Sequence, residues 1–578
     1  MNRPDNPVDG LFRLMRLRPF HALRERWKEG YGWADLGADL SAGAVVALVA
    51  VPLSMALAVA SGVEPRHGLY TAIIAGFLVA LLGGSRFQVT GPTAAFVVIL
   101  APIASKFGLP GLLMAGTMAG LLLIVMGLAR MGRVIQFVPY PVTTGFTAGI
   151  GLVIATLQLK DFFGLQPGPL PDHFIERALT LFSARGTGSW MEFAVGSVTL
   201  AGLILWPKIN RRVPAPLIVL LGITVGTVLL NTYFPSFHVA TIATRFPGMN
   251  GDPGGIPASL PSFVFPWRWV GPDGLFPKVT LSYVEALVPA AFAIALLGAI
   301  ESLLSAVVAD GMTRTRHDPD AELLALGKGN IVTAFFGGVP ATGAFARTAT
   351  NIRAGARSPL AAMTHAVLVA VIVLLFAPYI SYLPMAAMAA LLLTVAWHMA
   401  EFYRVKQLFH LAPKSDRTVF LTAFVLTVTV DMVIGVSVGI VLAALLFLRR
   451  MASHTTGRTL SHGPTPSGKN WPKDVFVYEI TGPLFFGAVE NAVGALRTLG
   501  GNIRSVVLLM EGVPHLDVTG LVSLESAINE ILQSKKTVAL VGTAPQPLRL
   551  FRKTGLIGEG NPVLTFKTLD EALTTLKS

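Results

Sequence analysis

The chain has 578 residues, of which 53% are hydrophobic and 13% are charged, and its formal net charge is +13. Soluble domains carry about 25% charged residues, so this deficit predicts a protein that crosses a membrane many times. The absence of cysteine excludes disulfides, thiolate metal sites and cysteine nucleophiles. The chain begins with a cytoplasmic segment, 1–37, that is too rich in arginine for a cleavable signal peptide.

About fourteen apolar segments of membrane-spanning length follow, at roughly 20 residues per span. Their expected limits are 38–62, 68–83, 86–104, 109–130, 134–162, 190–207, 213–232, 286–311, 320–336, 338–355, 358–379, 381–401, 416–432 and 433–449. Basic residues fall in every second loop, which predicts an even number of spans with both ends of the membrane region in the cytoplasm. This placement also argues against a nucleic-acid partner for the positive charge.

Two apolar segments, one in each half of the chain, are interrupted by glycine and proline in the same order. Residues 83–96 read GGSRFQVTGPTAAF and residues 337–347 read GGVPATGAFAR. Each has a Gly-Gly pair, a short strand-like stretch, a Thr-Gly pair and a small-residue helix start. Such a matched pair of broken segments indicates the substrate site of a membrane carrier, because irregular backbone within a bilayer must line a cavity or be buried in protein.

The two helical halves are expected to begin near the bilayer midplane with their N-termini facing each other. Each helix start offers unpaired N–H groups and the positive end of a helix dipole, so the pair predicts a site for a small anion. A purely structural alternative is that glycine and proline only kink tightly packed helices. The predicted substrate-binding residues here are Pro92, Thr93, Ala94, Ala95, Gly343, Ala344 and Phe345.

After residue 450 the composition changes from apolar to mixed. Residues 451–473 are polar and predict a linker. In 474–578, apolar strand patterns at 475–480, 506–510 and 538–541 alternate with helical patterns at 490–499 and 520–532. This alternation predicts one small cytoplasmic α/β domain.

Several motifs, in the same order along nearly the whole chain, resemble those of a known family. Val89-Thr90-Gly91-Pro92-Thr93-Ala94 and Gly298-Ala299-Ile300-Glu301-Ser302 resemble the SulP anion transporters, the bacterial relatives of solute carrier family 26. His515-Leu516-Asp517-Val518-Thr519-Gly520 resembles the signature loop of a STAS domain. Residues 390–397, 431–434 and 482–486 are most similar to a branch of C4-dicarboxylate transporters that associates with acyl carrier protein.

The resemblance implies an all-α membrane domain, 38–450, built as a seven-plus-seven inverted repeat with two half-helices. Spans 1–4 and 8–11 would form a core domain, and spans 5–7 and 12–14 a gate domain. It also implies a homodimer, an elevator mechanism, a location in the bacterial inner membrane, and acyl carrier protein as a partner of the STAS domain.

Glu301 lies deep in the eighth span, where a carboxylate costs at least ~2.5 kcal/mol and usually faces a cavity. It is predicted to carry a coupling proton, and Ser305, one turn on, shares its face. The alternative is a neutral acid that only braces helices. Bicarbonate carriers of the family hold sodium with a threonine at the position of Phe345, so the phenylalanine here favours protons over sodium. No cofactor or metal is expected.

Three further positions bear on the substrate through the resemblance. Arg347 follows the second helix start, where family members often carry a basic residue that adds positive charge near the anion. The alternative is that Arg347 merely anchors span 10 at its cytoplasmic side. Leu53 replaces a glutamine that reaches the substrate in many sulfate-type relatives, which argues against sulfate, and Ser54 could take over part of that polar role.

In the STAS loop, Asp517 is followed by Val518 rather than a phosphorylatable serine, with Thr519 one residue later, so phosphoregulation is not expected.

The sequence thus predicts a proton-coupled carrier for C4-dicarboxylates such as succinate, fumarate or aspartate. A sulfate or bicarbonate transporter of the same family is the alternative within this class. An uncoupled anion exchanger or channel, and a membrane sensor signalling through the STAS domain, are alternatives from other classes. No nucleotide-binding loop or catalytic constellation is recognised, so neither a primary pump nor an enzyme is expected.

Overall fold

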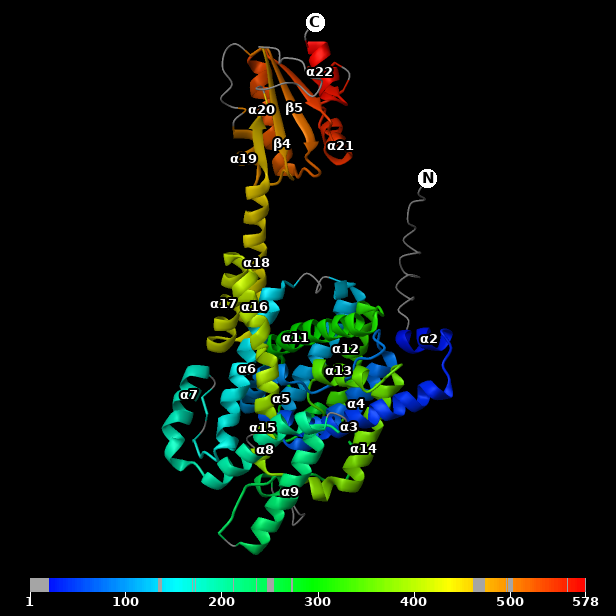
Figure 1. The fold of residues 1–578 in the computed structure, drawn as a ribbon, viewed down its shortest axis with the longest axis vertical. Helices are drawn as coiled ribbons and strands as arrows, with labels where there is room; N and C mark the ends of the chain where they lie inside the picture. The colour runs from blue at the N-terminus through cyan, green and yellow to red at the C-terminus, as the bar shows by residue number, and fades with distance from the viewer. Residues whose placement is uncertain are drawn as a thin grey trace. The chain divides into compact units, whose positions relative to one another are not determined.

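The computed structural model describes residues 20–133, 138–168, 170–171, 173–210, 213–234, 236–246, 254–271, 274–460, 474–494, 496, 503–558 and 560–576 (Figure 1). The chain divides into two compact units, Met1–Ile440 and Val441–Ser578. The first part of the predicted N-terminal segment, 1–19, and most of the predicted linker, 461–473, lie outside the described residues.

The first unit is almost entirely helical. Its elements are α2 (His21–Lys28), α3 (Trp33–Ala60), α4 (Pro65–Leu82), β1 (Thr90–Gly91), α5 (Ala94–Leu128), α6 (Tyr140–Phe162), α7 (Phe174–Ser183), η2 (Ala184–Thr187), α8 (Trp190–Ile209), α9 (Ala215–Tyr233), α10 (Ile242–Arg245), η3 (Pro266–Arg268), α11 (Leu281–Thr313), α12 (Pro319–Phe335), β2 (Thr342–Gly343), α13 (Phe345–Arg353), α14 (Leu360–Ile380), α15 (Met385–Ala400), α16 (Phe402–Leu411) and α17 (Lys414–Thr429). The next helix, α18 (Met432–His454), contains the boundary between the units.

Each of the fourteen predicted spans contains a helix or part of one, and spans 3 and 10 also contain the short strands β1 and β2. Among the described residues, ten helices are long and apolar enough to cross a membrane. Predicted spans 3 and 4 share α5, whose continuity is broken at Gly108, with φ +67°. Spans 9, 10 and 13 correspond to the shorter helices α12, α13 and α17. The short helices α2, α7, α10 and α16 were not predicted from the sequence.

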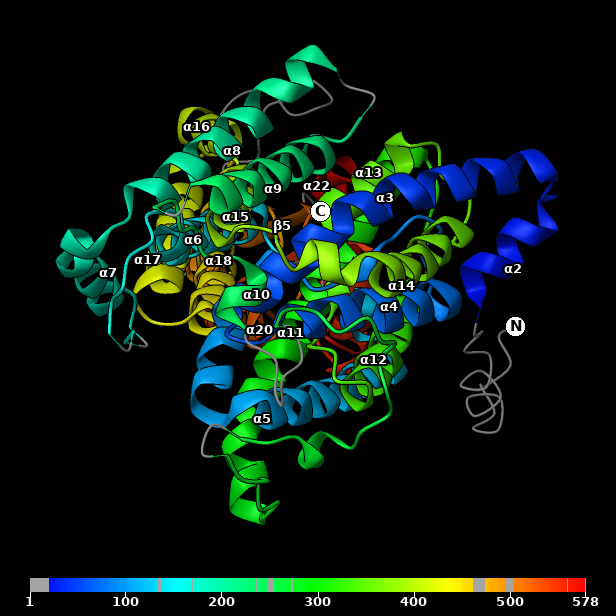
Figure 2. The ribbon, with the colours of Figure 1, turned by 90° about the horizontal axis from the view of Figure 1, so that it is seen from below.

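The helices of the first unit pack in two groups, which Figure 2 shows side by side. In one group, α5 packs against α11 and α12, and α14 packs against α3 and α4. In the other, α6 packs against α15 and α17, and α8 packs against α9 and α15. The assignment of these groups to a core and a gate domain, and their relative movement, stay predictions.

The contact between α5 and α12 depends on two glycines that face each other. A Cβ atom added to Gly120 would lie 2.7 Å from the carbonyl oxygen of Gly327, and one added to Gly327 would lie 2.6 Å from that of Gly120. Small residues let membrane helices approach to backbone contact, where van der Waals packing stabilises the pair. This close approach holds α12 beside the first half-helix.

Helix α2 is attached to the chain segment that precedes the first half-helix. Arg86 forms ion pairs with Glu25 and Glu29, and the Ala22 amide donates to the Gly83 carbonyl at 3.3 Å. The hydrogen bond from Arg86 lowers the pKa of the Glu29 carboxyl below its ordinary value of 4.5. The predicted N-terminal segment therefore includes a helix that packs on the core group.

The second unit contains a five-stranded sheet with helices on it. After α18 come β3 (Thr456–Thr459), β4 (Val475–Thr481), α19 (Val489–Val493), β5 (Ser505–Gly512), α20 (Val518–Gln533), β6 (Thr537–Val541), α21 (Pro545–Lys553), β7 (Val563–Phe566) and α22 (Leu569–Leu576). The strand order is β3-β4-β5-β6-β7, with β3 antiparallel to β4 and the other neighbours parallel.

The beginning of the predicted linker is wrong. Residues 456–459 form β3, an edge strand of the sheet, and α18 continues to His454 instead of ending near 449. The polar composition of an exposed edge strand, here Thr-Gly-Arg-Thr, resembles that of a loop, which explains the error.

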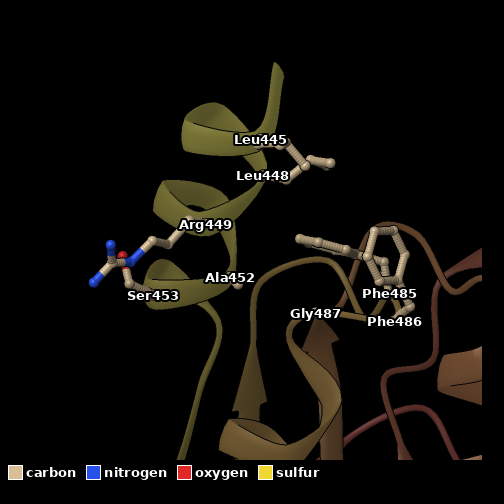
Figure 3. A pocket seen from close by; sticks show the side chains of 8 residues that line it. All are labelled: Leu445, Leu448, Arg449, Ala452, Ser453, Phe485, Phe486 and Gly487. Carbon is tan, nitrogen blue, oxygen red and sulfur yellow. The ribbon is translucent and has the colours of Figure 1, made fainter. Parts of the chain in front are cut away.

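An open groove of about 430 Å³ lies between the last turns of α18 and the loop 485–487. Leu445 and Leu448 point toward Phe485 and Phe486 across this groove (Figure 3).

Asp517 holds two parts of the second unit together. Its Oδ1 accepts a hydrogen bond from the Gly520 amide at 2.6 Å, which caps α20, and its Oδ2 accepts one from the Phe486 amide at 3.1 Å. Val518 is 72% exposed, and Thr519 is exposed as well. The acidic residue of the signature loop therefore has a structural role in this unit.

We expect Asp517→Ala to destabilise the second unit by about 2 kcal/mol, because the variant loses a helix cap and a second charge-assisted hydrogen bond. Hydrogen exchange of full-length protein should show faster exchange at the start of α20 and in the loop 485–487. Thr519→Ala, two residues further on and exposed, is the control and should leave exchange unchanged. Equal exchange in Asp517→Ala and the parent protein would contradict the structural role.

Candidate functional site

The two broken segments meet in the middle of the first unit. β1 pairs antiparallel with β2, with Thr90 opposite Gly343 and Gly91 opposite Thr342. Each strand is followed within two residues by a helix, α5 at Ala94 and α13 at Phe345. The N-terminus of each half-helix therefore lies beside the strand pair, and the predicted facing of the two N-termini stays a prediction.

Neither helix start is capped by a side chain in the described part of the chain. Thr93, the N-cap residue of α5, donates its hydroxyl to Glu301 Oε2 at 2.9 Å instead. Ala344, the N-cap residue of α13, has no side-chain acceptor, and its own amide donates to the Val89 carbonyl at 2.9 Å. The first-turn amides and both positive helix ends therefore remain available to an anion.

Arg347 supplies a full positive charge at this place. Its side chain is 1% exposed, and Nη2 donates to the Pro92 carbonyl. Its Nε and Nη1 have no hydrogen-bond partner among the described residues. The guanidinium lies against Gly91, where an added Cβ atom would lie 3.2 Å from Cζ. A buried guanidinium with two uncommitted nitrogens is suited to hold a planar or tetrahedral oxyanion.

Helix α11 contributes three polar residues to the same region. Glu301 is 6% exposed and bonds Thr93. Ser302, which the sequence analysis missed, accepts a hydrogen bond from the Gly343 amide at 2.8 Å and lies 3.0 Å from Thr342 Oγ1. Ser305 donates to Thr348 Oγ1 at 3.3 Å. The structure thus separates the predicted pair: Glu301 faces the first half-helix, whereas Ser305 faces the second.

The remaining predicted residues take different places. Pro92, Ala94 and Ala95 are buried at the start of α5, and Phe345 is half-buried at the start of α13. Ser54 is fully buried on α3 and its hydroxyl has no hydrogen-bond partner among the described residues. Within the described part of the chain Ser54 is therefore not bonded to either half-helix, and its predicted place in the site stays a prediction.

Among the buried carboxylates of the core group, Glu301 and Glu322 differ in their hydrogen bonding. Glu322 on α12 accepts three bonds, from the amides of Gly84 and Ser85 and from the Gln88 side chain. Glu301 accepts a single bond, from Thr93. Donors to a carboxylate stabilise its charged form. Glu301 thus has fewer donors than Glu322 to stabilise its charged form, and its role in proton coupling stays a prediction.

Sequence reasoning missed Glu322, although a signal was present. An acidic residue within a predicted membrane span is a functional-site hypothesis by default, and Glu322 lies only two residues inside the predicted ninth span. Its proximity to the loop made it resemble an ordinary residue of a helix start.

With this geometry in place, the comparisons with known proteins identify the family. Residues 36–423 match the sulfate permease family, and residues 470–572 match the STAS domain. The chain is 40% identical to the putative sulfate transporter YvdB of Bacillus subtilis (strain 168), covering 91% of this chain and 95% of the relative. It is 30% identical to the bicarbonate transporter BicA of Picosynechococcus sp., covering 93% and 94%.

Two solved structures resemble the fold. The transmembrane domain of a cyanobacterial bicarbonate transporter BicA has a TM-score of 0.59 and 26% identity, covering 72% of this chain and 98% of that chain. Murine Solute Carrier 26 family member A9, an anion transporter, has a TM-score of 0.81 and 18% identity, covering 100% and 96%. The chain therefore belongs to the sulfate permease family of membrane anion transporters, rather than to a family of enzymes, and carries a STAS domain at its C-terminal end.

Proposed function

We propose that the protein moves a small inorganic oxyanion, sulfate or bicarbonate, across the membrane together with a proton. The observation that carries this proposal is Arg347, whose Nε and Nη1 are uncommitted beside two uncapped helix starts. Such a compact array of donors suits an anion whose oxygens surround one central atom. The relatives named above as sulfate and bicarbonate transporters support the same class of substrate.

Proton coupling rests on Glu301, which is buried and bonded by one donor next to the first helix start. The side chain of Phe345 offers no oxygen to a sodium ion at the start of α13. A proton on Glu301 would remove a negative charge from the neighbourhood of an incoming anion, so anion and proton would favour each other's binding.

A C4-dicarboxylate is the second candidate, and one residue favours it. Leu53 places an apolar side chain where many sulfate-type relatives carry a glutamine that reaches the substrate. The predicted acyl carrier protein partner gains no support from the relatives named above. The homodimer and the cytoplasmic position of both ends stay predictions.

Competition in proteoliposomes distinguishes the substrates. Uptake of labelled sulfate, driven by an inward proton gradient, should be inhibited by unlabelled sulfate and bicarbonate at concentrations at least about tenfold lower than by succinate or fumarate. The opposite order of inhibition would replace the proposal with the dicarboxylate alternative. Large currents that ignore the proton gradient would indicate an uncoupled channel.

A further inference from the structure

The backbone before the first half-helix is bonded to the first turn of α12. Glu322 Oε2 accepts hydrogen bonds from the Gly84 amide at 2.9 Å and the Ser85 amide at 3.0 Å, and the Gly84 carbonyl accepts one from the Asp318 amide at 3.2 Å. An added Cβ atom on Gly84 would lie 3.2 Å from Ala321 Cβ. Both polar groups of Gly84 are therefore paired with α12, at backbone contact.

Glu322 is also linked to the strand pair through the side chain of Gln88. Its Oε1 accepts a hydrogen bond from Gln88 Nε2 at 2.8 Å, and both side chains are almost fully buried. The Gln88 amide lies against β2, since a Cβ atom added to Gly343 would lie 2.7 Å from Gln88 Cδ. The carboxylate is thus connected through one amide to the residue that opposes Thr90 in the strand pair.

The same helix holds the second broken segment. Asn330 Oδ1 accepts a hydrogen bond from the Ala341 amide at 2.7 Å, and its Nδ2 donates to the Ala341 carbonyl at 3.0 Å. Glu322 and Asn330 are eight residues apart on α12, about 12 Å along its axis at 1.5 Å per residue. One rigid helix therefore sets the distance between the chain segments that lead into the two half-helices.

We propose that Glu322 is a positioning residue for anion binding: by bonding Gly84, Ser85 and Gln88, it sets where the start of α5 and the Pro92 carbonyl lie relative to Arg347. This inference rests on the anion site proposed above. The site needs several donors aimed at one point, and hydrogen bonds weaken steeply when their geometry is lost. Loss of the Glu322 acceptors should therefore act on affinity for the anion more than on the maximal rate.

The test compares two substitutions with different hydrogen-bonding capacity. Glu322→Met fills a similar volume but accepts none of the three bonds, and should raise the KM for anion uptake at least about tenfold with a maximal rate within about threefold of the parent. Glu322→Gln keeps an oxygen for the Gly84 and Ser85 amides. Its amide can then donate to Gln88 Oε1, which has no partner in the described part of the chain, once the Gln88 amide flips. Glu322→Gln should therefore keep the KM within about threefold.

Lys328→Met is the matched control, because it removes a charge from an exposed position on the same helix and should leave KM unchanged. Anion-induced thermal shifts of each full-length variant, measured with sulfate, bicarbonate and succinate, provide a second readout. The parent protein's shifts test the proposed substrate, whereas the difference between variants tests Glu322, so the two failures are distinguishable.

An unchanged KM and thermal shift in Glu322→Met would overturn the inference, as would a loss in Glu322→Gln equal to that in Glu322→Met. If Glu322→Met does not fold, the double variant Gln88→Leu with Glu322→Gln keeps the Gly84 and Ser85 bonds and removes only the connection to β2. That variant should raise KM at least about fivefold, and an unchanged KM would reject the positioning role.

Discussion

Replacing Arg347 by glutamine should lower the affinity for the transported anion by about a hundredfold or more. Two guanidinium nitrogens, Nε and Nη1, have no partner among the described residues although the side chain is almost fully buried. Each charge-assisted hydrogen bond to an anion contributes about 1.5–3 kcal/mol, and every 1.4 kcal/mol is a factor of about ten in affinity. The loss of two such bonds gives the expected factor.

The measurement is concentration-dependent uptake in proteoliposomes, supported by anion-induced thermal shifts of the purified protein. Arg353→Gln is the matched control, since Arg353 is on the same helix, α13, but is exposed at its other end. Arg347→Lys keeps the charge without the planar fork of donors, so it should lose less affinity than Arg347→Gln. If Arg347 only anchored the span, Arg347→Gln would lower the melting temperature while leaving the affinity unchanged.

The order of the elements and the position of the half-helices could be predicted because each depends on local signals. Thr-Gly followed by small residues ends a strand and begins a helix in both halves, and the structure places α5 at Ala94 and α13 at Phe345. Glycine and proline act on their own backbone, so their effect is readable without knowing what packs against them. The broken segments can therefore be recognised from the sequence alone.

The bonds that complete the site could not be predicted because they join residues far apart in the sequence. Glu322 and Gln88 are separated by 234 positions, and Thr93 and Glu301 by 208. Helical spacing suggested that Ser305 would accompany Glu301, but Ser305 bonds Thr348 because α13 packs against that part of α11. Neighbours on a helix face share a direction, whereas tertiary packing decides which partner each one meets.

The second unit illustrates the same limit at an edge strand. β4, β5 and β6 are buried and apolar, and the sequence predicted them closely. β3 has no apolar pattern, and it pairs with β4 through main-chain hydrogen bonds and an ion pair between Arg458 and Glu479, neither of which leaves an apolar signal in the sequence. A strand of this kind is recognisable only after its partner strand has been placed.

Replacing Glu301 by glutamine should abolish concentrative, proton-driven uptake while anion binding remains. Glu301 accepts a hydrogen bond from Thr93 through one oxygen, and the amide oxygen of glutamine can accept the same bond. The variant therefore keeps the neutral shape of the protonated acid but cannot release a proton. Glu301 has a single donor whereas Glu322 has three, so we expect Glu301 rather than Glu322 to exchange a proton during transport.

The expected result has two parts that must occur together. In proteoliposomes with an inward proton gradient, the parent protein should accumulate labelled anion above equilibrium, whereas Glu301→Gln should only equilibrate it, with at least about a tenfold lower peak of accumulation. The anion-induced thermal shift should stay within about twofold of the parent.

Glu285→Gln is the control, because Glu285 is an exposed acid near the start of the same helix. Normal accumulation by Glu301→Gln would show that the coupling proton binds elsewhere. Loss of the thermal shift would instead make Glu301 part of the anion's own binding site, since a group that only carries the proton leaves the anion's donors at Arg347 and the helix starts in place.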